Sequence, residues 1–457
     1  MFGGSFISQV RSNPGKVFLL ACLLTFSAYL RFGAVANSVV DVPVRADAKD
    51  YYMYALNMQE FGVYSRSVSG LTGSSTAPAP DALRSPGYPM LLYPFVDRMI
   101  SSQSVRNIQL FQALLSTLTV AILFLAFSRL LPFGWAFASA LLVGISPHLV
   151  NTTIYVLSET LFAFLLSLMF LVGSLAADQR RNAMVLLLAG VTVGLAALTR
   201  PVLMYFLPIL IVLMAWHCRP GWKKVAGCLS LGFLVIVSPW MIRNYTVLGT
   251  TSDKTLTNNA LHHGMYPDMM YEGDPRTYGM AYRADHFDTR GKEPSFVIEE
   301  IFKRASAEPA KYAYWYLIGK PMHLWRWLPR RNFVPAPVMM PAIYPTVESP
   351  FISNPIYIFL LVVMGAAHGF VMLGAVIAVI ACFSPLMHRY FTPPQILGLR
   401  LAALLPLYNT AILAVAAPYT RYAIPFFPYV YVLFILSLYL MFRIYKQQQK
   451  QPEEGSS

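Results

Sequence analysis

The chain has 457 residues, of which 56% are hydrophobic and only 12% are charged. Soluble domains carry about 25% charged residues, so this composition excludes an ordinary soluble protein. The formal net charge of +14 does not indicate nucleic-acid binding, because the basic residues lie in loops beside apolar runs. Basic residues in such places suit anionic lipid headgroups. We therefore predict a membrane protein that contacts membrane lipids and binds no nucleic acid.

Apolar runs close to the length that crosses a bilayer core, roughly 20 residues, recur along the chain. They predict an all-α polytopic protein with about ten transmembrane helices in a single domain, 1–457. The first run follows Arg11 and Lys16, as in a signal peptide, but no clear small-residue cleavage site follows it, so we expect an uncleaved span. The predicted spans are 17–35, 108–127, one ending at Pro147, one starting near Val156, one ending at Leu198, one ending near Trp216, one ending at Pro239 and Trp240, 356–382, 397–416 and 424–442.

Two long loops, 36–105 and 241–354, and a short tail, 443–457, lie outside these spans. Basic residues in short loops mark the cytoplasmic side of a membrane protein. Those that fall on one side here are Arg11, Lys16, Arg129, Arg180, Arg181, Arg219, Lys223, Lys224, Arg389, Arg443, Lys446 and Lys450. We therefore expect an inner-membrane protein with both termini and the tail in the cytoplasm, and with both long loops on the extracytoplasmic face.

The first long loop contains a predicted amphipathic helix within 45–64. Asp47 and Asp50 open this helix, and Asp47 can cap it by accepting free N–H groups of the first turn. Gly62 follows its last residue. Spacings of three and four residues give the helix an aromatic, half-apolar face made of Tyr51, Tyr54, Ala55 and Met58. Such a helix suits a membrane–water boundary.

Ionisable residues gather at the outer ends of the predicted spans. They are Asp47, Asp50, Arg84, Glu159, Arg200, Arg243 and Arg421. An ionisable group inside a helix bundle at the membrane edge indicates a functional site. Simpler roles stay open for single members: a helix cap for Asp47, a favourable helix-dipole position for Glu159, and headgroup contact for the arginines.

These residues fall in short motifs that follow one another along the chain. The motifs are Asp47-Ala-x-x-Tyr51, Ala55-Leu-Asn57, Gly62-Val-Tyr64, Arg84-Ser-Pro-Gly-Tyr-Pro89, Val156-Leu-Ser-Glu159, Leu198-Thr-Arg-Pro201, Pro239-Trp-Met-Ile-Arg-Asn244 and Arg421-Tyr-x-x-Pro425. The ordered set resembles the GT-C glycosyltransferases, integral membrane sugar transferases that include protein O-mannosyltransferases and the aminoarabinose transferase of lipid A. The resemblance extends over nearly all the predicted spans.

The resemblance implies a GT-C type of fold and transfer of a hexose or pentose from a polyprenyl-phosphate donor on the extracytoplasmic face. In the family the first-loop aspartate is the catalytic carboxylate, so the resemblance implies this role for Asp47. It also implies that Glu159 occupies the second acidic position of the family. The family often has two adjacent acidic residues, whereas here Ala48 follows Asp47 and the next carboxylate is Asp50. Which of these two aspartates is the base therefore stays open.

The chemistry of such a transfer asks for the same residue types. A base must take the proton of the incoming hydroxyl, and cations must stabilise the negative charge that develops on the departing phosphate. Arginine grips phosphate in a bidentate fork and stays charged. A single displacement predicts inversion at the anomeric carbon. We expect the donor phosphate to bind Arg243, Arg421, Arg200 and Arg84, in that order of preference, and the substrate to be lined by Tyr51, Tyr88 and Tyr422.

The acceptor stays undetermined among a glycan, a lipid and a protein, and we expect the loop 241–354 to select it. His262 and His263 could hold a divalent metal, but adjacent histidines rarely face one ion, so we predict no metal and no other cofactor. The cysteines show no CxxC or metal spacing, which predicts no disulfide; they are Cys22, Cys218, Cys228 and Cys382.

The alternative function is a membrane transporter or lipid flippase. Transporters place charged or helix-breaking residues near the middle of the membrane, often in repeated halves. In this sequence the charges gather at one rim, and no internal repeat is evident. The sequence therefore favours the enzyme.

Overall fold

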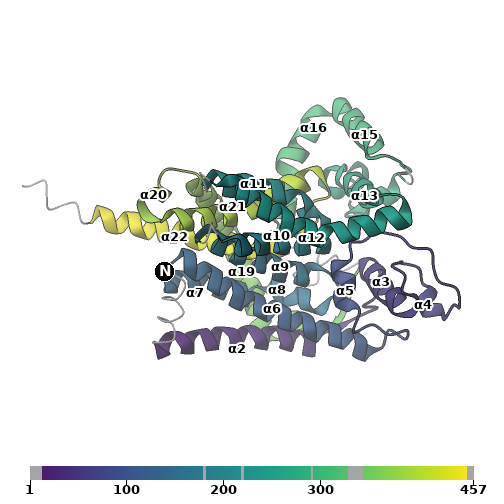
Figure 1. The fold of residues 1–457 in the computed structure, drawn as a ribbon, viewed down its shortest axis with the longest axis horizontal. Helices are drawn as coiled ribbons and strands as arrows, with labels where there is room; N and C mark the ends of the chain where they lie inside the picture. The colour runs from purple at the N-terminus through teal and green to yellow at the C-terminus, as the bar shows by residue number, and fades with distance from the viewer. Residues whose placement is uncertain (1–12, 179–181, 218–220, 290–291, 328–342, 450–457) are drawn as a thin grey trace, which may run out of the picture.

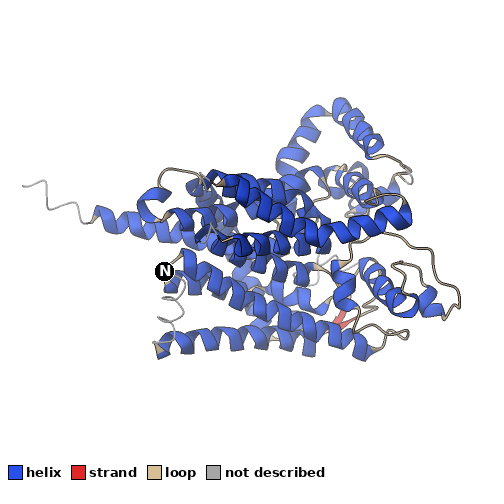
Figure 2. Cartoon of the chain, in the orientation of Figure 1, coloured by secondary structure: helices blue, strands red, loops and turns tan. Residues whose placement is uncertain are grey.

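The computed structural model describes residues 13–178, 182–217, 221–289, 292–327 and 343–449, which form a bundle of long helices with shorter helices at one end (Figure 1). Almost all the regular structure is helical (Figure 2). The helices of the bundle are α2 (Pro14–Ala36), α6 (Ser102–Leu130), α7 (Phe133–Ile145), α8 (Pro147–Asn151), α9 (Glu159–Asp178), α10 (Ala183–Thr199), α11 (Phe206–His217), α12 (Trp222–Leu248), α19 (Pro355–Cys382), α21 (Pro393–Val415) and α22 (Phe427–Gln448).

Each predicted span coincides with a helix of the bundle. Within the described residues, seven helices are long and apolar enough to cross a membrane, and an eighth span arises if the bent pair Phe133–Ile145 and Pro147–Ile154 is counted as one. Two further predicted spans correspond to shorter apolar helices, α10 and α11. The all-α polytopic fold is therefore confirmed, whereas the exact number of spans stays a prediction.

The seventh predicted span does not end where the sequence indicated. Helix α12 continues through Pro239 to Leu248, where Gly249 ends it with a φ of 69°. Proline removes only one hydrogen bond from a helix, whereas a glycine in the left-handed conformation closes the last turn. Arg243 and Asn244 are consequently helical residues rather than loop residues.

The elements of the two long loops lie at one end of the bundle, opposite the end of α22 (Figure 1). The first loop forms α3 (Asp47–Phe61), α4 (Ser69–Thr72) and α5 (Gly87–Leu92). Strand β1 (Val39–Val40) pairs antiparallel with β2 (Thr346–Glu348), which joins the two loops. The other short elements are η1 (Thr152–Ile154), η2 (Pro201–Tyr205), α13 (Thr255–Gly264), η3 (Pro267–Met269), η4 (Tyr271–Gly273), η5 (Pro275–Thr277), α14 (Ala281–Ala284), α15 (Pro294–Ala307), α16 (Pro309–Tyr314), η6 (Trp315–Gly319), α17 (Lys320–Leu324), α18 (Pro350–Ser353), α20 (Met387–Tyr390) and η7 (Thr420–Phe426).

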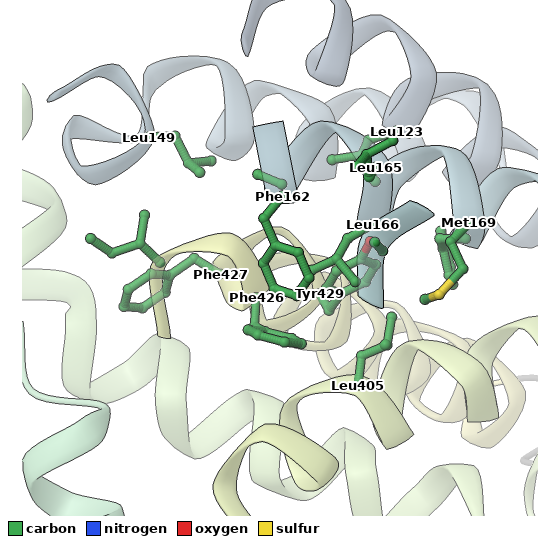
Figure 3. Close-up of a cluster of buried hydrophobic side chains, with 14 of the residues drawn as sticks. Leu123, Leu149, Phe162, Leu165, Leu166, Met169, Leu405, Phe426, Phe427 and Tyr429 are labelled. Carbon is green, nitrogen blue, oxygen red and sulfur yellow. The ribbon is translucent and has the colours of Figure 1, made fainter. Parts of the chain in front are cut away.

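A buried aromatic core fixes η7 against α9. Phe162 of α9 points toward Phe426 of η7, and their ring centroids are 5.8 Å apart (Figure 3). Phe170, further along α9, and Tyr429, in the first turn of α22, pack edge to face with ring centroids 5.2 Å apart. Because Glu159 begins α9 and Arg421 belongs to η7, this core sets the separation of two charged residues of the outer rim.

Arg31 is a charged residue inside the first predicted span. Arg31 of α2 is fully buried and donates hydrogen bonds to the Val143 and Gly144 carbonyl oxygens at 3.2 and 2.7 Å, and to Ser116 Oγ at 2.7 Å. The two carbonyls belong to the end of α7, where the chain bends by 46°. Arg31 thus satisfies backbone groups that the bend exposes, which is a structural role for a buried cation.

Candidate functional site

The first residue of α3 is Asp47, and it does not cap the helix. The N-cap residue is Ala46, with a φ of 47°, and it makes no side-chain capping hydrogen bond. The Ala48 N–H instead lies 3.4 Å from the Tyr344 hydroxyl, which itself donates to the Arg45 carbonyl oxygen at 3.2 Å. The predicted capping role of Asp47 was therefore wrong, because a tyrosine from the second long loop occupies the end of the helix and leaves the carboxylate to other partners.

The partners of Asp47 are two arginines from distant parts of the chain. Arg84 Nη2 lies 2.8 Å from Asp47 Oδ1, and Arg421 Nη2 donates to Asp47 Oδ2. The Asp47 side chain is 25% exposed, so a ligand can reach it. Burial alone would raise the pKa of Asp47, but the Arg421 and Arg84 guanidiniums hold this pKa below its usual range. Asp47 is therefore a charged carboxylate held between two cations.

The ion pairs continue on both sides of Asp47. Arg84 also donates to Asp50 Oδ2, at 3.1 Å from Nε and 2.9 Å from Nη2. On the other side, Arg421 Nε is 3.9 Å from Glu159 Oε1, and Arg200 Nη1 is 3.1 Å from the same oxygen. Three carboxylates and three guanidiniums thus alternate along one line, from α3 across η7 to the first residue of α9 and the residue after α10. We call this set the ionic line; its members are Asp50, Arg84, Asp47, Arg421, Glu159 and Arg200.

Three members of the ionic line have buried polar atoms that make no hydrogen bond within the described chain: Glu159, Arg421 and Arg200, whose Nη1 makes only the ion pair to Glu159. Glu159 is 3% exposed, and its Oε2 has no hydrogen-bond partner among the described residues. Arg421 is 11% exposed, and its Nε likewise makes no hydrogen bond within the described chain. Buried polar atoms are almost always paired in folded proteins, so these atoms mark places where a ligand can bind.

Two of the three predicted substrate-lining tyrosines touch the ionic line. The Tyr422 ring lies 4.7 Å from the Arg200 guanidinium and 5.1 Å from that of Arg421. The Arg84 guanidinium is 5.5 Å from the Tyr51 ring. Tyr88 is fully buried behind Tyr51, at a centroid distance of 5.1 Å. Its hydroxyl donates to Gln112 Oε1 at 2.8 Å, so Tyr88 supports the site from behind rather than lining it.

Arg243, the first choice for the donor phosphate, makes its contacts elsewhere. Its Nη1 donates to the Asp81 carbonyl oxygen at 2.9 Å, and its Nη2 donates to the Tyr64 carbonyl oxygen at 3.2 Å. The guanidinium also stacks near the Trp240 ring, at 5.3 Å. The structure thus brings six of the seven predicted charged residues together and leaves Arg243 to brace the first loop, because α12 runs on past Pro239 and carries Arg243 beside residues 64 and 81.

The chain is similar to one protein family in part of its sequence and to solved membrane proteins in its fold. Residues 91–242 match the family of dolichyl-phosphate-mannose-protein mannosyltransferases, which is less than half of the chain. No curated protein sequence matches. The archaeal oligosaccharyltransferase AglB from Archaeoglobus fulgidus, solved in complex with an inhibitory peptide and a dolichol-phosphate, superposes with a TM-score of 0.50 at 14% identity, over 96% of this chain and 52% of its own. An Archaeoglobus fulgidus oligosaccharyltransferase in complex with zinc and sulfate superposes with a TM-score of 0.51 at 15% identity, over 93% of this chain and 49% of its own. The chain has the GT-C fold.

This GT-C chain spans about half the length of the oligosaccharyltransferase that it matches. ArnT from Cupriavidus metallidurans, bound to undecaprenyl phosphate, superposes at 13% identity with a TM-score of 0.41. The superposition extends over 93% of this chain and 77% of the ArnT chain. At such low identity the similarity to the oligosaccharyltransferase identifies the fold alone, and the activity has to be argued from the residues of this chain.

The histidines of this GT-C chain have separate partners. His262 Nε2 is 2.8 Å from the Tyr266 hydroxyl, whereas His263 stacks on Tyr282 at 3.8 Å and lies 3.3 Å from the Tyr419 hydroxyl. Among the described residues, no group of three or more His, Cys, Asp or Glu side chains could hold a metal ion. Cys218 lies outside the described residues, and the other three cysteines are free.

Sequence reasoning missed Tyr344, which anchors the start of α3. The sequence around it, 343–349, shows no periodicity that would connect it with residue 45. Ser158 lies in the motif that ends at Glu159 but was not a predicted site residue. Its Oγ nevertheless lies 3.5 Å from the Tyr51 hydroxyl. No local signal predicts either contact, because both depend on how distant segments pack.

Proposed function

We propose that this chain is a membrane glycosyltransferase that moves a sugar from a polyprenyl-phosphate donor to an acceptor hydroxyl. The observation that carries the proposal is the Asp47 carboxylate held between Arg84 and Arg421 at the loop end of a GT-C fold. This arrangement supplies both groups that the reaction needs, a base for the hydroxyl proton and cations for the leaving phosphate.

In the proposed reaction, the acceptor oxygen attacks the anomeric carbon of the donor sugar. The bond between that carbon and the phosphate oxygen breaks, the new glycosidic bond forms, and the acceptor proton passes to the Asp47 carboxylate. Polyprenyl phosphate leaves with the electron pair of the broken bond. A single displacement of this kind inverts the configuration at the anomeric carbon. The sugar, whether a hexose or a pentose, is not fixed by these steps.

The ionic line also suggests how the base becomes active. Arg84 and Arg421 keep the pKa of Asp47 low, which makes a weak base. A donor phosphate would compete for the same guanidiniums, and each contact that it takes weakens their hold on Asp47. Donor binding would therefore raise the basicity of Asp47 when the acceptor arrives. We now rank the phosphate ligands as Arg421, Arg84 and Arg200, and propose Asp50 and Glu159 as the carboxylates that position them.

The dolichol-phosphate seen with the archaeal oligosaccharyltransferase supports a lipid phosphate donor for a chain of this fold. The face of the membrane is argued from charge. Arg129, Arg389 and Arg443 lie near the ends of helices opposite the two long loops, and short-loop basic residues mark the cytoplasmic side. We therefore propose an extracytoplasmic site, with both termini in the cytoplasm of an inner-membrane protein.

The variant Asp47→Asn tests the assigned base. In purified protein reconstituted in lipid nanodiscs, transfer from metabolically labelled lipid-linked sugars to a membrane extract should fall by about 10²–10⁴-fold, the usual contribution of a general base. Binding of undecaprenyl phosphate, measured by native mass spectrometry, should persist because the arginines remain. Lys303→Ala, on an 81% exposed side chain of α15, is the control. Near-normal turnover of Asp47→Asn would refute the role of Asp47 as the base.

Arg31 does not support the transporter or flippase alternative. This buried charge of α2 is occupied by backbone carbonyls of α7 and by Ser116. Reconstituted vesicles that contain a fluorescent polyprenyl phosphate separate the two functions. Transbilayer movement of this lipid by wild-type protein, with no transfer from any labelled lipid-linked sugar, would replace the glycosyltransferase proposal by the flippase.

A further inference from the structure

A polar cavity lies between the first loop, the end of α12 and the start of α13. It has a volume of about 390 Å³ and is bounded by residues 80–82 of the first loop, by the end of α12, by the start of α13 and by Lys292 and Glu293. The end of α12 and α13 lie at the loop end of the bundle (Figure 1). The ligand of such a cavity arrives from water rather than from the lipid core.

The chain itself limits the distance between this cavity and the proposed base. Asp81 forms part of the cavity wall, and Arg84, three residues later, binds Asp47 through its guanidinium. Three residues extend at most about 11 Å, so the cavity wall and the backbone of Arg84 are neighbours. A molecule in this cavity would therefore touch the same short segment of the first loop that carries the arginine bound to Asp47.

The chemistry of the walls fits a carbohydrate. Carboxylates, ammonium groups, hydroxyls and one amide alternate with three apolar side chains around the cavity. A lipid tail would leave these polar groups unpaired. Sugar hydroxyls both donate and accept hydrogen bonds, whereas the C–H surface of a sugar ring packs on apolar side chains. The lining residues that this argument uses are Asp253, Lys254, Glu293, Thr250, Asn258 and Leu248.

One wall residue has a buried polar atom without a partner. Asn258 is 2% exposed, and its Nδ2 donates to the Lys292 carbonyl oxygen at 2.6 Å. This bond fixes the orientation of the amide, because the Lys292 carbonyl can only accept. The remaining amide atom, Oδ1, has no hydrogen-bond partner within the described residues. An unpaired acceptor in a cavity wall is suited to a donor from a ligand, and a sugar hydroxyl is such a donor.

We propose that this cavity is an acceptor subsite, which binds a carbohydrate unit of the acceptor while a neighbouring hydroxyl reaches Asp47. The inference rests on the proposed glycosyltransferase function and adds the class of the acceptor. Asn258 Oδ1 accepts a hydrogen bond from a sugar hydroxyl, and the exposed pair of Lys254 and Glu293, 2.8 Å apart, lies at the edge of the cavity. The carbohydrate belongs either to a glycolipid or to a polysaccharide.

Two variants test the subsite in different ways. Asn258→Leu removes the amide at similar volume, and Ser252→Trp fills the cavity from an exposed wall position. Full-length protein in nanodiscs receives metabolically labelled lipid-linked sugars as donor and a dilution series of membranes from cells that lack this protein as acceptor. We expect the acceptor concentration for half-maximal transfer to rise at least tenfold in both variants. Binding of undecaprenyl phosphate should stay within twofold of wild type.

The outcomes separate the two proposals. If wild-type protein transfers no sugar, the proposed function fails. If wild type is active and Ser252→Trp and Asn258→Leu show unchanged acceptor dependence, the subsite is overturned and the function stands. Loss of undecaprenyl phosphate binding in a variant with wild-type melting temperature would also overturn a separate acceptor subsite.

The destination of the label tests the acceptor class. Label that extracts into chloroform and methanol identifies a glycolipid, and label in the water-soluble polymer fraction identifies a polysaccharide. Label that protease releases as glycopeptides would overturn the carbohydrate acceptor. Lys303→Ala, far along α15 from the cavity wall in sequence, serves as the matched surface control in every assay.

Discussion

At the scale of single residues, the charge balance around Asp47 explains why this carboxylate stands out from the other acidic residues of the loops. Two guanidiniums from different elements hydrogen-bond to it at once, whereas Glu159, which also faces two guanidiniums, lies 3.9 Å from Arg421 Nε. Its proton affinity therefore depends on whatever else those arginines bind. The same feature makes the residue a contributor to stability as well as a proposed base.

The stability of the folded protein at acidic pH should depend on the charge of Asp47. The pKa of Asp47 in the folded chain is lowered, so its ion pairs stabilise the fold fully above the unfolded value of about 3.9. This stabilisation is lost as the pH falls through the folded pKa. We expect the melting temperature of wild type to fall more steeply between about pH 5 and pH 2 than that of Asp47→Asn, measured by thermal unfolding in detergent. Parallel curves would show that the pairs around Asp47 do not differ between folded and unfolded chains.

Arg243 gives a prediction of a different kind, because it holds backbone carbonyls of Tyr64 and Asp81 rather than a carboxylate. Arg243→Ala should loosen the first-loop wall of the acceptor subsite. We expect a rise in the acceptor KM of roughly 5–30-fold, the effect of losing one or two kcal/mol of hydrogen bonding. The donor KM should change little. Arg443→Ala, at the opposite end of the bundle, is the control, and an equal change in both KM values would contradict a positioning role.

At the scale of the elements, the position of each charged residue depends on close helix packing. Helices α10 and α12 approach each other at Gly190 and Gly232. A Cβ atom at Gly232 would lie 2.1 Å from the Leu187 carbonyl oxygen, and one at Gly190 would lie 2.1 Å from that of Leu229. Small residues allow this approach in membrane helices. Since Arg200 follows α10 directly, the packing helps to fix one end of the ionic line.

Gly232→Ala should therefore separate α10 from α12. Overpacking of this kind costs about 1–3 kcal/mol, and we expect the melting temperature to fall by several degrees, with reduced transfer activity. Gly227→Ala is a matched control in the same helix, because a Cβ there meets nothing within 4 Å. Alanine favours helix by about 1 kcal/mol over glycine, so this control should be neutral or stabilising. Equal effects of the two substitutions would point to helix propensity rather than packing.

At the scale of the whole molecule, both long loops lie at one end of the bundle, and β1 and β2 connect them. The ionic line, the cavity and the loop that carries Tyr344 consequently lie at one end of the bundle. The basic residues of the opposite end support our proposal that the loop end is extracytoplasmic, and labelling can test this orientation directly.

A membrane-impermeant maleimide should report the orientation. In a variant without native cysteines, we expect Lys303→Cys to be labelled in intact spheroplasts, because α15 belongs to the loop end of the bundle. Gln447→Cys, near the end of α22, should be labelled only after the membrane is permeabilised. The opposite pattern would place both termini outside and refute the extracytoplasmic site.

The sequence by itself determined the class of protein, the approximate location of the long helices of the bundle and the residue types of the proposed site. Hydropathy, loop charge and short motifs are local properties, and each can be read within a window of about 20 residues. The boundaries were less certain, since Pro239 did not end α12, and the tail predicted from 443 begins as the last turns of α22.

Only the tertiary structure decided which of these residues meet. Arg421 binds Asp47 across 374 positions of sequence, and Tyr344 takes the place at the start of α3 that the sequence assigned to Asp47. Arg243 carries the same charge as Arg84 and Arg421 and lies in an equally suggestive motif, yet it binds loop carbonyls. Ion pairing depends on how distant helices pack against one another, and no property of the neighbouring sequence records that packing.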